Sequence, residues 1–134
     1  MSSSFTDPLE VRRLQGPNDL WATLRDVRYW TGCLDELDLP LEARCATCYT
    51  VPAGFETDFA SIPRIFWTLV GHPAGQYAQA AVLHDWLYRT KAAPRAEADR
   101  IFREAMQVLE VPAWQRWAMW AAVRVGGSAA YGGD

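Results

Sequence analysis

The sequence of 134 residues contains only two histidines and three cysteines, and it has no long apolar run. No stretch approaches the roughly 20 apolar residues that span a bilayer, so we expect no transmembrane segment. The N-terminus lacks the basic start and apolar run of a signal peptide, which predicts a soluble protein made in a cytoplasm. Thirteen basic residues stand against 16 acidic ones without any basic stripe. This balance excludes nucleic-acid binding through a positive surface.

The cysteines are too few for a structural zinc site. Cys45 and Cys48 form a C-x-x-C pair, a spacing that can bind zinc or exchange disulfides. Zinc needs a second pair of ligands, and the sequence has neither another C-x-x-C nor an H-x-x-x-H. The pair also lacks the strand-then-helix context of a redox motif. We therefore predict reduced, partly buried thiols, Cys33 included.

What is present favours one α+β domain over residues 1–134, a length that can bury a core. Residues 1–62 are rich in strand and turn signals. Residues 20–32 have the β-branched and aromatic character of one strand. Residues 44–61 resume extended structure, interrupted by a turn signal at Pro52–Gly54. Together these segments predict a small antiparallel sheet.

Residues 63–127 are predicted to be helical, followed by an irregular tail at 128–134. A first helix within 76–91 carries apolar and small residues at helical spacing. The next two helices begin at Pro94 and Pro112, since proline suits a first helical turn, and the last ends at a glycine pair. The short connection between the first two helices predicts an antiparallel hairpin.

The first helix contains an unusual group of polar residues. His84 and Tyr88 are four residues apart and share a face, and Asp85 flanks it. Asp99 lies at the edge of the apolar stripe of the second helix, so an antiparallel hairpin brings it to this face. An imidazole held by a carboxylate and a tyrosine hydroxyl is poised as a general base. Asp85 is then available for a hard cation such as calcium, which prefers oxygen ligands.

A structural interpretation competes with this one. A His-Asp-Tyr group can tie two helices together through satisfied hydrogen bonds, and spacing alone favours that reading. Burial distinguishes the two. An enzyme needs an open cleft above His84 and Asp85, whereas a structural knot buries both.

The segments "HDWLYR" and "EADRIFREAM" resemble the catalytic core of the secretory-type phospholipase A2 superfamily, in particular its bacterial and viral branches. The resemblance implies that His84 is the base that activates water and that Asp85 binds calcium. It further implies that Tyr88 and Asp99 orient the imidazole, while calcium polarises the ester carbonyl.

Two parts of this resemblance are incomplete. The disulfide cysteines that flank the HD pair in secretory phospholipases are replaced by Ala81 and Leu87. The glycine-rich calcium loop has a loose counterpart in "VGHPAGQY", where Gly71 and Gly75 let backbone carbonyls turn inward. The resemblance makes this segment the remaining part of the metal site.

A second resemblance covers residues 51–127. The motifs "VPAGFETDFASIPR", "GQYAQAAVLHDWLY", "EADRIFREAM" and "AVRVGG" occur in this order in a family of short phage- and prophage-encoded proteins of unknown function. This resemblance implies a phage or prophage origin and brings no activity with it.

The motif "TDFASIP" has no phospholipase counterpart. Asp58 is interpreted as a further metal ligand, a partner of His84, or a cap of the turn that starts at Pro63. Ser61 could be a nucleophile with His84 as its base. It lacks a glycine-rich elbow, and capping is the better interpretation.

The third helix carries Trp114, Trp117 and Trp120. Such a face is expected in the core or at an oligomer contact, and the alternative is a lipid interface. Arg116 and Arg124 are expected to lie largely away from this face.

The first functional hypothesis is a phage-encoded, calcium-dependent hydrolase of lipid esters that acts on envelope phospholipid. The second is a non-enzymatic phage tail, virion or assembly component in which the helix pair is a structural knot and the partners are other virion proteins. The third is a metal-dependent hydrolase of cell-wall peptide or glycan, which would prefer peptidoglycan fragments to vesicles.

Overall fold

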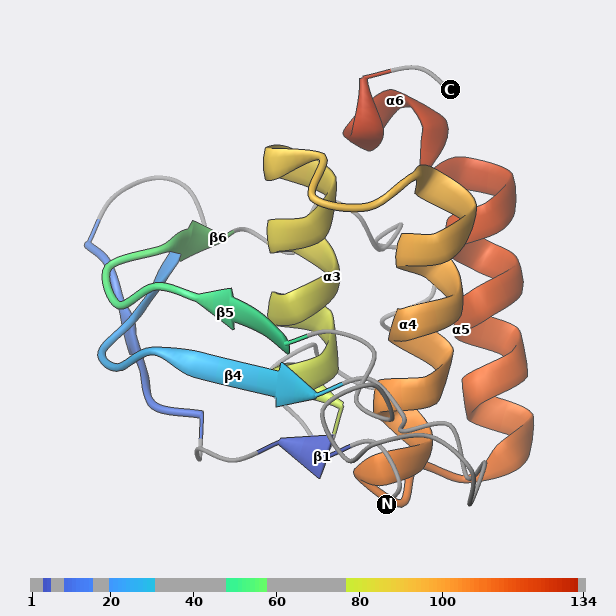
Figure 1. The fold of residues 1–134 in the computed structure, drawn as a ribbon, viewed down its shortest axis with the longest axis horizontal. Coiled ribbons are helices and arrows are strands. Elements are labelled where there is room, and N and C mark those ends of the chain that lie inside the picture. The colour runs from blue at the N-terminus through green and yellow to red at the C-terminus, as the bar shows by residue number, and fades with distance from the viewer. Residues whose placement is uncertain (1–3, 6–8, 16–19, 31–47, 58–76, 133–134) are drawn as a thin grey trace, which may run out of the picture.

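A computed structural model describes residues 4–5, 9–15, 20–30, 48–57 and 77–132 (Figure 1). The strands are β1 (Ser4–Phe5), β2 (Val11–Arg13), β3 (Trp21–Thr23), β4 (Val27–Trp30), β5 (Cys48–Val51) and β6 (Glu56–Thr57). The helices are α3 (Ala78–Thr90), α4 (Arg95–Val108), α5 (Ala113–Gly126) and α6 (Ser128–Tyr131). The predicted α+β arrangement, with antiparallel strands before the helices, is confirmed.

The strands form two small antiparallel sheets, ordered β1-β4-β5 and β2-β3-β6. The prediction of one strand over residues 20–32 is therefore wrong. A bend separates β3 from β4. Thr23 Oγ1 donates a hydrogen bond to the Pro52 carbonyl, and Asp26 Oδ1 accepts one from the Ala53 amide. These bonds hold the bend against the turn after β5, because short polar side chains compete with the ladder for backbone groups.

The predicted turn between β5 and β6 is confirmed. Gly54 has a φ of 84°, a left-handed conformation that glycine adopts without steric cost. The amide of Gly54 also donates to the Thr23 carbonyl. The turn therefore connects both sheets, and it carries the chain from β5 in one sheet to β6 in the other.

The three long helices run antiparallel to their neighbours, with α4 packed against both α3 and α5 (Figure 1). Pro94 and Pro112 directly precede α4 and α5, as predicted. The two connections are tight, since Lys91 and Glu110 both have a positive φ. The predicted helical hairpin and third helix are confirmed.

The prediction of an irregular tail is wrong for residues 128–131, which form the single turn α6. Tyr131 packs edge-on against Tyr88, with ring centroids 5.2 Å apart. Its hydroxyl donates to the carbonyl of Ala93. Tertiary contacts thus order a segment whose local sequence, rich in glycine, favours no regular structure.

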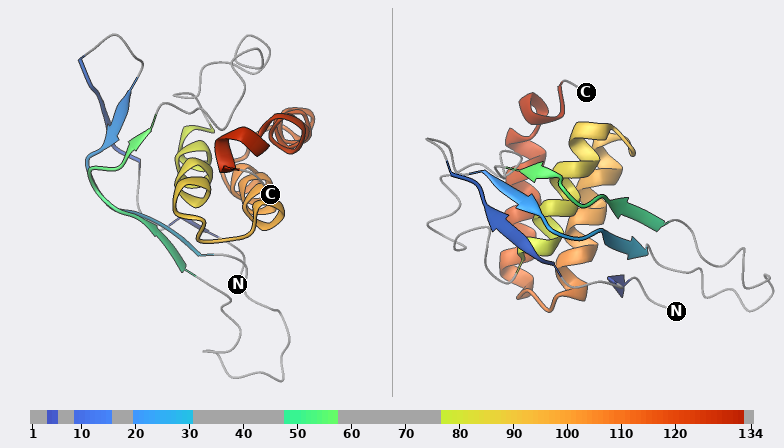
Figure 2. Two further views of the ribbon diagram at one scale, coloured as in Figure 1. Left: turned by 90° about the horizontal axis from the view of Figure 1, so that it is seen from above. Right: turned by 90° about the vertical axis from the view of Figure 1, so that its left-hand side faces the viewer.

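Figure 2 shows the strands on one side of α3 and the other long helices on the opposite side. The helix α3 is accordingly buried around most of its circumference, and its buried residues include His84 and Asp85. On the strand side the core takes in Val27, Tyr29 and Val51. His84 and Asp85 therefore lie in the interior of the molecule.

Candidate functional site

Asp99 is the centre of a buried hydrogen-bond network that joins three helices. Its Oδ1 lies 2.7 Å from His84 Nε2 and accepts a hydrogen bond of 2.5 Å from the Tyr88 hydroxyl. Its Oδ2 accepts a hydrogen bond of 2.8 Å from Arg124 Nη1. The structure thus brings together the histidine, tyrosine and aspartate that helical spacing placed on facing surfaces.

The His84 ring is fixed by aromatic neighbours as well as by Asp99. It stacks on Phe102 with a centroid distance of 4.6 Å and lies 4.2 Å from the Tyr88 ring. A ring packed against two aromatic rings and hydrogen-bonded through one nitrogen keeps a single orientation. This arrangement holds Nε2 on the carboxylate and turns Nδ1 to the opposite side of the ring.

Burial lowers the pKa of His84, and this effect outweighs the hydrogen bond from Asp99, which raises it. Burial raises the pKa of Asp99. The hydrogen bonds from His84, Tyr88 and Arg124 lower this pKa by more than burial raises it, so the net shift is downward. We therefore assign a neutral imidazole and an ionised carboxylate. Because the carboxylate can only accept, the proton of the imidazole lies on Nε2.

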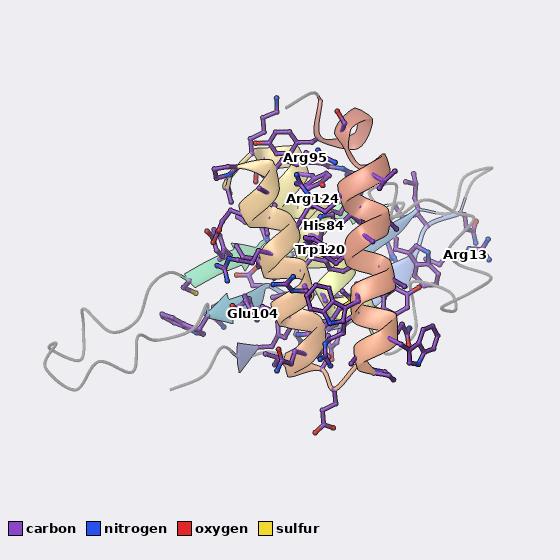
Figure 3. All side chains as sticks on the ribbon, turned by 90° about the vertical axis from the view of Figure 1, so that its right-hand side faces the viewer. Arg13, His84, Arg95, Glu104, Trp120 and Arg124 are labelled. Carbon is purple, nitrogen blue, oxygen red and sulfur yellow. The ribbon has the colours of Figure 1, made fainter. Side chains whose placement is uncertain are left out.

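Arg124 is a member of the network that the sequence reasoning missed. Its guanidinium neutralises the buried Asp99 carboxylate, so His84 need not carry a positive charge. A usable signal was spacing, because Trp120 and Arg124 are four residues apart and share a helix face. Figure 3 shows both side chains between α4 and α5, so the expectation that Arg124 lies away from the tryptophan face is wrong for Trp120.

Arg95 supports the same corner from the start of α4. It is 8% exposed, and its Nη2 donates to the carbonyls of Val123 and Arg124. These carbonyls belong to the last turn of α5, where the Val123 carbonyl also accepts a hydrogen bond from the Gly127 amide. Arg95 thereby fixes the backbone that carries Arg124 (Figure 3).

Asp85 points to the strands and not to Asp99. Its Oδ2 accepts a hydrogen bond of 2.5 Å from the Thr57 hydroxyl and lies 3.3 Å from Arg89 Nη2. Arg89 also donates to the carbonyl of Glu56. Asp85 therefore ties α3 to β6, at the first residue of the "TDFASIP" motif.

Only Asp85 of the expected calcium site belongs to the described residues. Calcium takes six to eight oxygen ligands, and Asp85 already shares its carboxylate with Thr57 and the cation Arg89. The described residues contain no group of three or more His, Cys, Asp or Glu that could hold a metal ion. These donors alone are too few for calcium.

Several residues with a predicted role in the site or as free thiols lie outside the described part of the chain. They are Asp58, Ser61, Gly71, Gly75, Cys33 and Cys45. Cys48 is described and is a half-buried free thiol, as predicted for it.

The principal side chains are fully enclosed. His84 and Asp99 have no exposed surface, and Asp85 is 3% exposed. This is the burial expected of a structural knot, and it differs from the open cleft expected of an enzyme.

The tryptophans of α5 are not in the core, so the core prediction is wrong for two of them. Trp114 is 59% exposed and Trp117 is 53% exposed. Trp120 is half-buried beside Trp117, and both rings lie under the guanidinium of Arg103. Among the described helices, none is long and apolar enough to cross a membrane.

Residues 36–123 match a family described as "Protein of unknown function (DUF1353)", and the chain belongs to this family. The uncharacterized protein y4jT of Sinorhizobium fredii (strain NBRC 101917 / NGR234) is 39% identical over 87 residues. The similar segment makes up 64% of this chain and 24% of that protein, so the chain corresponds to about a quarter of its relative. No solved structure matches the chain.

Proposed function

We propose that this protein is a phage-encoded hydrolase of lipid esters, similar in its catalytic group to phospholipase A2. The observation that carries the proposal is the arrangement of His84, whose Nε2 is held by Asp99 while Tyr88 donates to the same oxygen. This arrangement matches the roles that the sequence resemblance implies for the three residues. It fixes both the tautomer and the orientation of a neutral imidazole, which a general base requires.

This mechanism requires that the enclosed His84 become accessible to water and the ester. Nδ1 of His84 then removes a proton from water as the oxygen attacks the ester carbonyl. The imidazolium that forms is stabilised by the Asp99 carboxylate 2.7 Å away. The tetrahedral intermediate then collapses, and the imidazolium returns its proton to the departing alcohol oxygen. The products are a fatty acid and a lysolipid, and His84 is restored to its neutral form.

Calcium is a further component of the proposal. Asp85 would be its ligand among the described residues, and the resemblance assigns the remaining ligands to the backbone near Gly71 and Gly75, with Asp58 as an additional donor. Calcium supplies an electrophile for the ester carbonyl when bound. Calorimetric titration of calcium into the wild type and Asp85→Asn tests this component. We expect saturable binding that the variant loses, and no heat of binding in the wild type would remove calcium from the proposal.

The hydrolase is tested by fatty-acid release from phospholipid vesicles in the presence of calcium. We compare the wild type with His84→Gln, whose amide can still donate to Asp99 but cannot act as a base. Gln107→Ala, an exposed position on α4, is the matched control. Release by the wild type and the control, with loss in a folded His84→Gln protein, supports the proposal. Equal release by all three contradicts it.

Burial favours a second candidate, a non-enzymatic phage assembly or virion component that resides in the host cytoplasm before assembly. In this case His84, Asp99 and Arg124 hold α3, α4 and α5 together and do no chemistry. His84→Gln would then change only the free energy of unfolding, while wild-type protein would release no fatty acid. The vesicle assay together with urea denaturation therefore separates the two candidates.

A further inference from the structure

The outer face of α5 is apolar although it is exposed. Ala113, Trp117, Ala121 and Val125 follow one another every four residues, which places them in one row along the helix. All four are exposed, and Val125 is 88% exposed. Trp114 lies beside the start of this row and is also exposed. We call these five residues the α5 apolar face.

The opposite side of the same helix is apolar too. Met119, Ala122 and Val123 are buried against the rest of the core. A surface helix normally has a polar face opposite its buried side, whereas α5 has apolar residues on both. An exposed apolar face with two tryptophans at one end is therefore a surface that gains free energy when something covers it.

The charges on α5 indicate what covers it. The helix contains Arg116 and Arg124 and no acidic residue, and Arg124 is paired with the buried Asp99 of α4. Arg103 from α4 adds a third cation, which lies over the Trp117 ring at 4.5 Å. This cationic border stands on a chain whose net charge is −3, so it is a local feature of this face.

A second copy of the chain is a poor match for this face. In a symmetric pair the same patch meets itself, so the arginines of one copy would approach those of the other with no acidic residue on α5 to offset them. An anionic surface suits the border better. Tryptophan rings also prefer the boundary between lipid headgroups and acyl chains, where an apolar helix face can lie flat.

We propose that the α5 apolar face docks the protein on the surface of an anionic phospholipid bilayer. The tryptophans and Val125 enter the headgroup boundary, and Arg103 and Arg116 meet the lipid phosphates. The helix lies along the surface and does not cross it. This surface is independent of the proposed hydrolysis, because it rests on α5 and on Arg103 of α4 and requires no reaction at His84.

The test is cosedimentation with vesicles of phosphatidylcholine alone or mixed with phosphatidylglycerol, at low and high salt. The wild type is expected to bind the mixed vesicles, with tryptophan emission shifted to shorter wavelength, and to be released by salt. The double variant Trp114→Ser/Trp117→Ser is expected to bind on the order of tenfold or more weakly. Val125→Asp changes only a fully solvated position and is also expected to weaken binding.

The matched control is Trp30→Ser, which removes a 40% exposed tryptophan from β4, outside the α5 apolar face, and should leave binding unchanged. Circular dichroism establishes that each variant is folded. The proposal is overturned if the wild type binds neither kind of vesicle. It is also overturned if Val125→Asp and the double variant bind as well as Trp30→Ser. Self-association in analytical ultracentrifugation, lost in the same variants and without vesicle binding, would assign the face to a second copy.

Discussion

At the scale of single residues, Asp99 is the charged group that links α3, α4 and α5. It has no exposed surface, and from α4 it receives hydrogen bonds from two side chains of α3 and one of α5. An ionised carboxylate is expensive to bury unless it is paired and fully hydrogen-bonded. The network meets that requirement, and removing either side of it leaves a buried group without its partner.

We predict that Asp99→Asn lowers the free energy of unfolding by about 2–4 kcal/mol, because Arg124 loses its counter-charge and the donors lose an anionic acceptor. Urea denaturation at neutral pH measures the change. Glu97→Gln is the matched control on the same helix, since its ion pair with Arg100 is exposed. Such a pair contributes about 0–1 kcal/mol. Equal losses in the two variants would show that Asp99 does not hold the helices together.

Gly127 is a second residue whose identity is fixed by its surroundings. A Cβ atom at this position would lie 2.7 Å from the Tyr88 hydroxyl and 2.4 Å from the Val123 carbonyl oxygen. We predict that Gly127→Ala displaces Tyr88 from Asp99 and lowers the free energy of unfolding by about 1–3 kcal/mol. Thermal denaturation checks this result. A variant as stable as the wild type would mean that the end of α5 can move aside.

At the scale of secondary-structure elements, β6 is connected to α3 by a buried hydrogen bond from the Thr57 hydroxyl and by another from Arg89 to the Glu56 carbonyl. Thr57 has no exposed surface and donates to Asp85. We predict that Thr57→Val, which keeps the shape, lowers the free energy of unfolding by about 1–3 kcal/mol because Asp85 loses a donor. The same change at Thr50, which is exposed on β5, is the control and should have little effect.

Amide hydrogen exchange locates the effect of Thr57→Val. The amides of β3 and β6 should exchange faster, while those of α4 and α5 should keep their protection. Uniform loss of protection over all elements would contradict a local role for this contact.

The elements differ in how far the sequence predicts them. The helices α4 and α5 follow from their prolines and apolar spacing, and α3 from spacing alone. The break between β3 and β4 does not follow, because it depends on bonds from Thr23 and Asp26 to a turn more than 25 residues away. Long-range partners of this kind leave no local signal.

The candidate site shows the same division. His84, Tyr88 and Asp99 were predicted to meet because their spacing on two short-linked helices leaves little choice. Arg124 was missed because its role depends on where α5 packs, and Thr57 because it reaches Asp85 from a separate sheet. Exposure of the α5 tryptophans could not be predicted. An apolar pattern indicates that a helix face is covered, but it does not say whether this chain or another molecule covers it.

At the scale of the whole molecule, the buried network makes stability depend on pH. Burial lowers the pKa of His84 below its ordinary value of 6.5. The unfolded chain therefore binds a proton at a pH where the folded protein does not. Neutral His84 makes its full contribution to the free energy of unfolding above pH 6.5. This contribution is lost as the pH falls from 6.5 through the lowered pKa of the folded state. Asp99, whose pKa is lowered from 3.8, adds a second loss at more acidic pH.

We predict that the free energy of unfolding decreases between about pH 7 and pH 5, and that His84→Gln flattens this part of the curve. Urea denaturation over a series of buffers provides the measurement. The chain has one other histidine, and His72→Gln is the control that should retain the wild-type slope. A slope that disappears only in the control would assign the pH dependence to His72.

The position of Arg124 has a practical consequence for anyone who shortens this protein. Similarity to the family ends at residue 123, one residue before Arg124. A fragment cut at that boundary keeps Asp99 and loses its cation, together with Gly127 and the Tyr131 ring that covers Tyr88. The segment that matches the family therefore ends before the residue that balances the charge of Asp99. Expression of related chains should extend through the turn corresponding to α6.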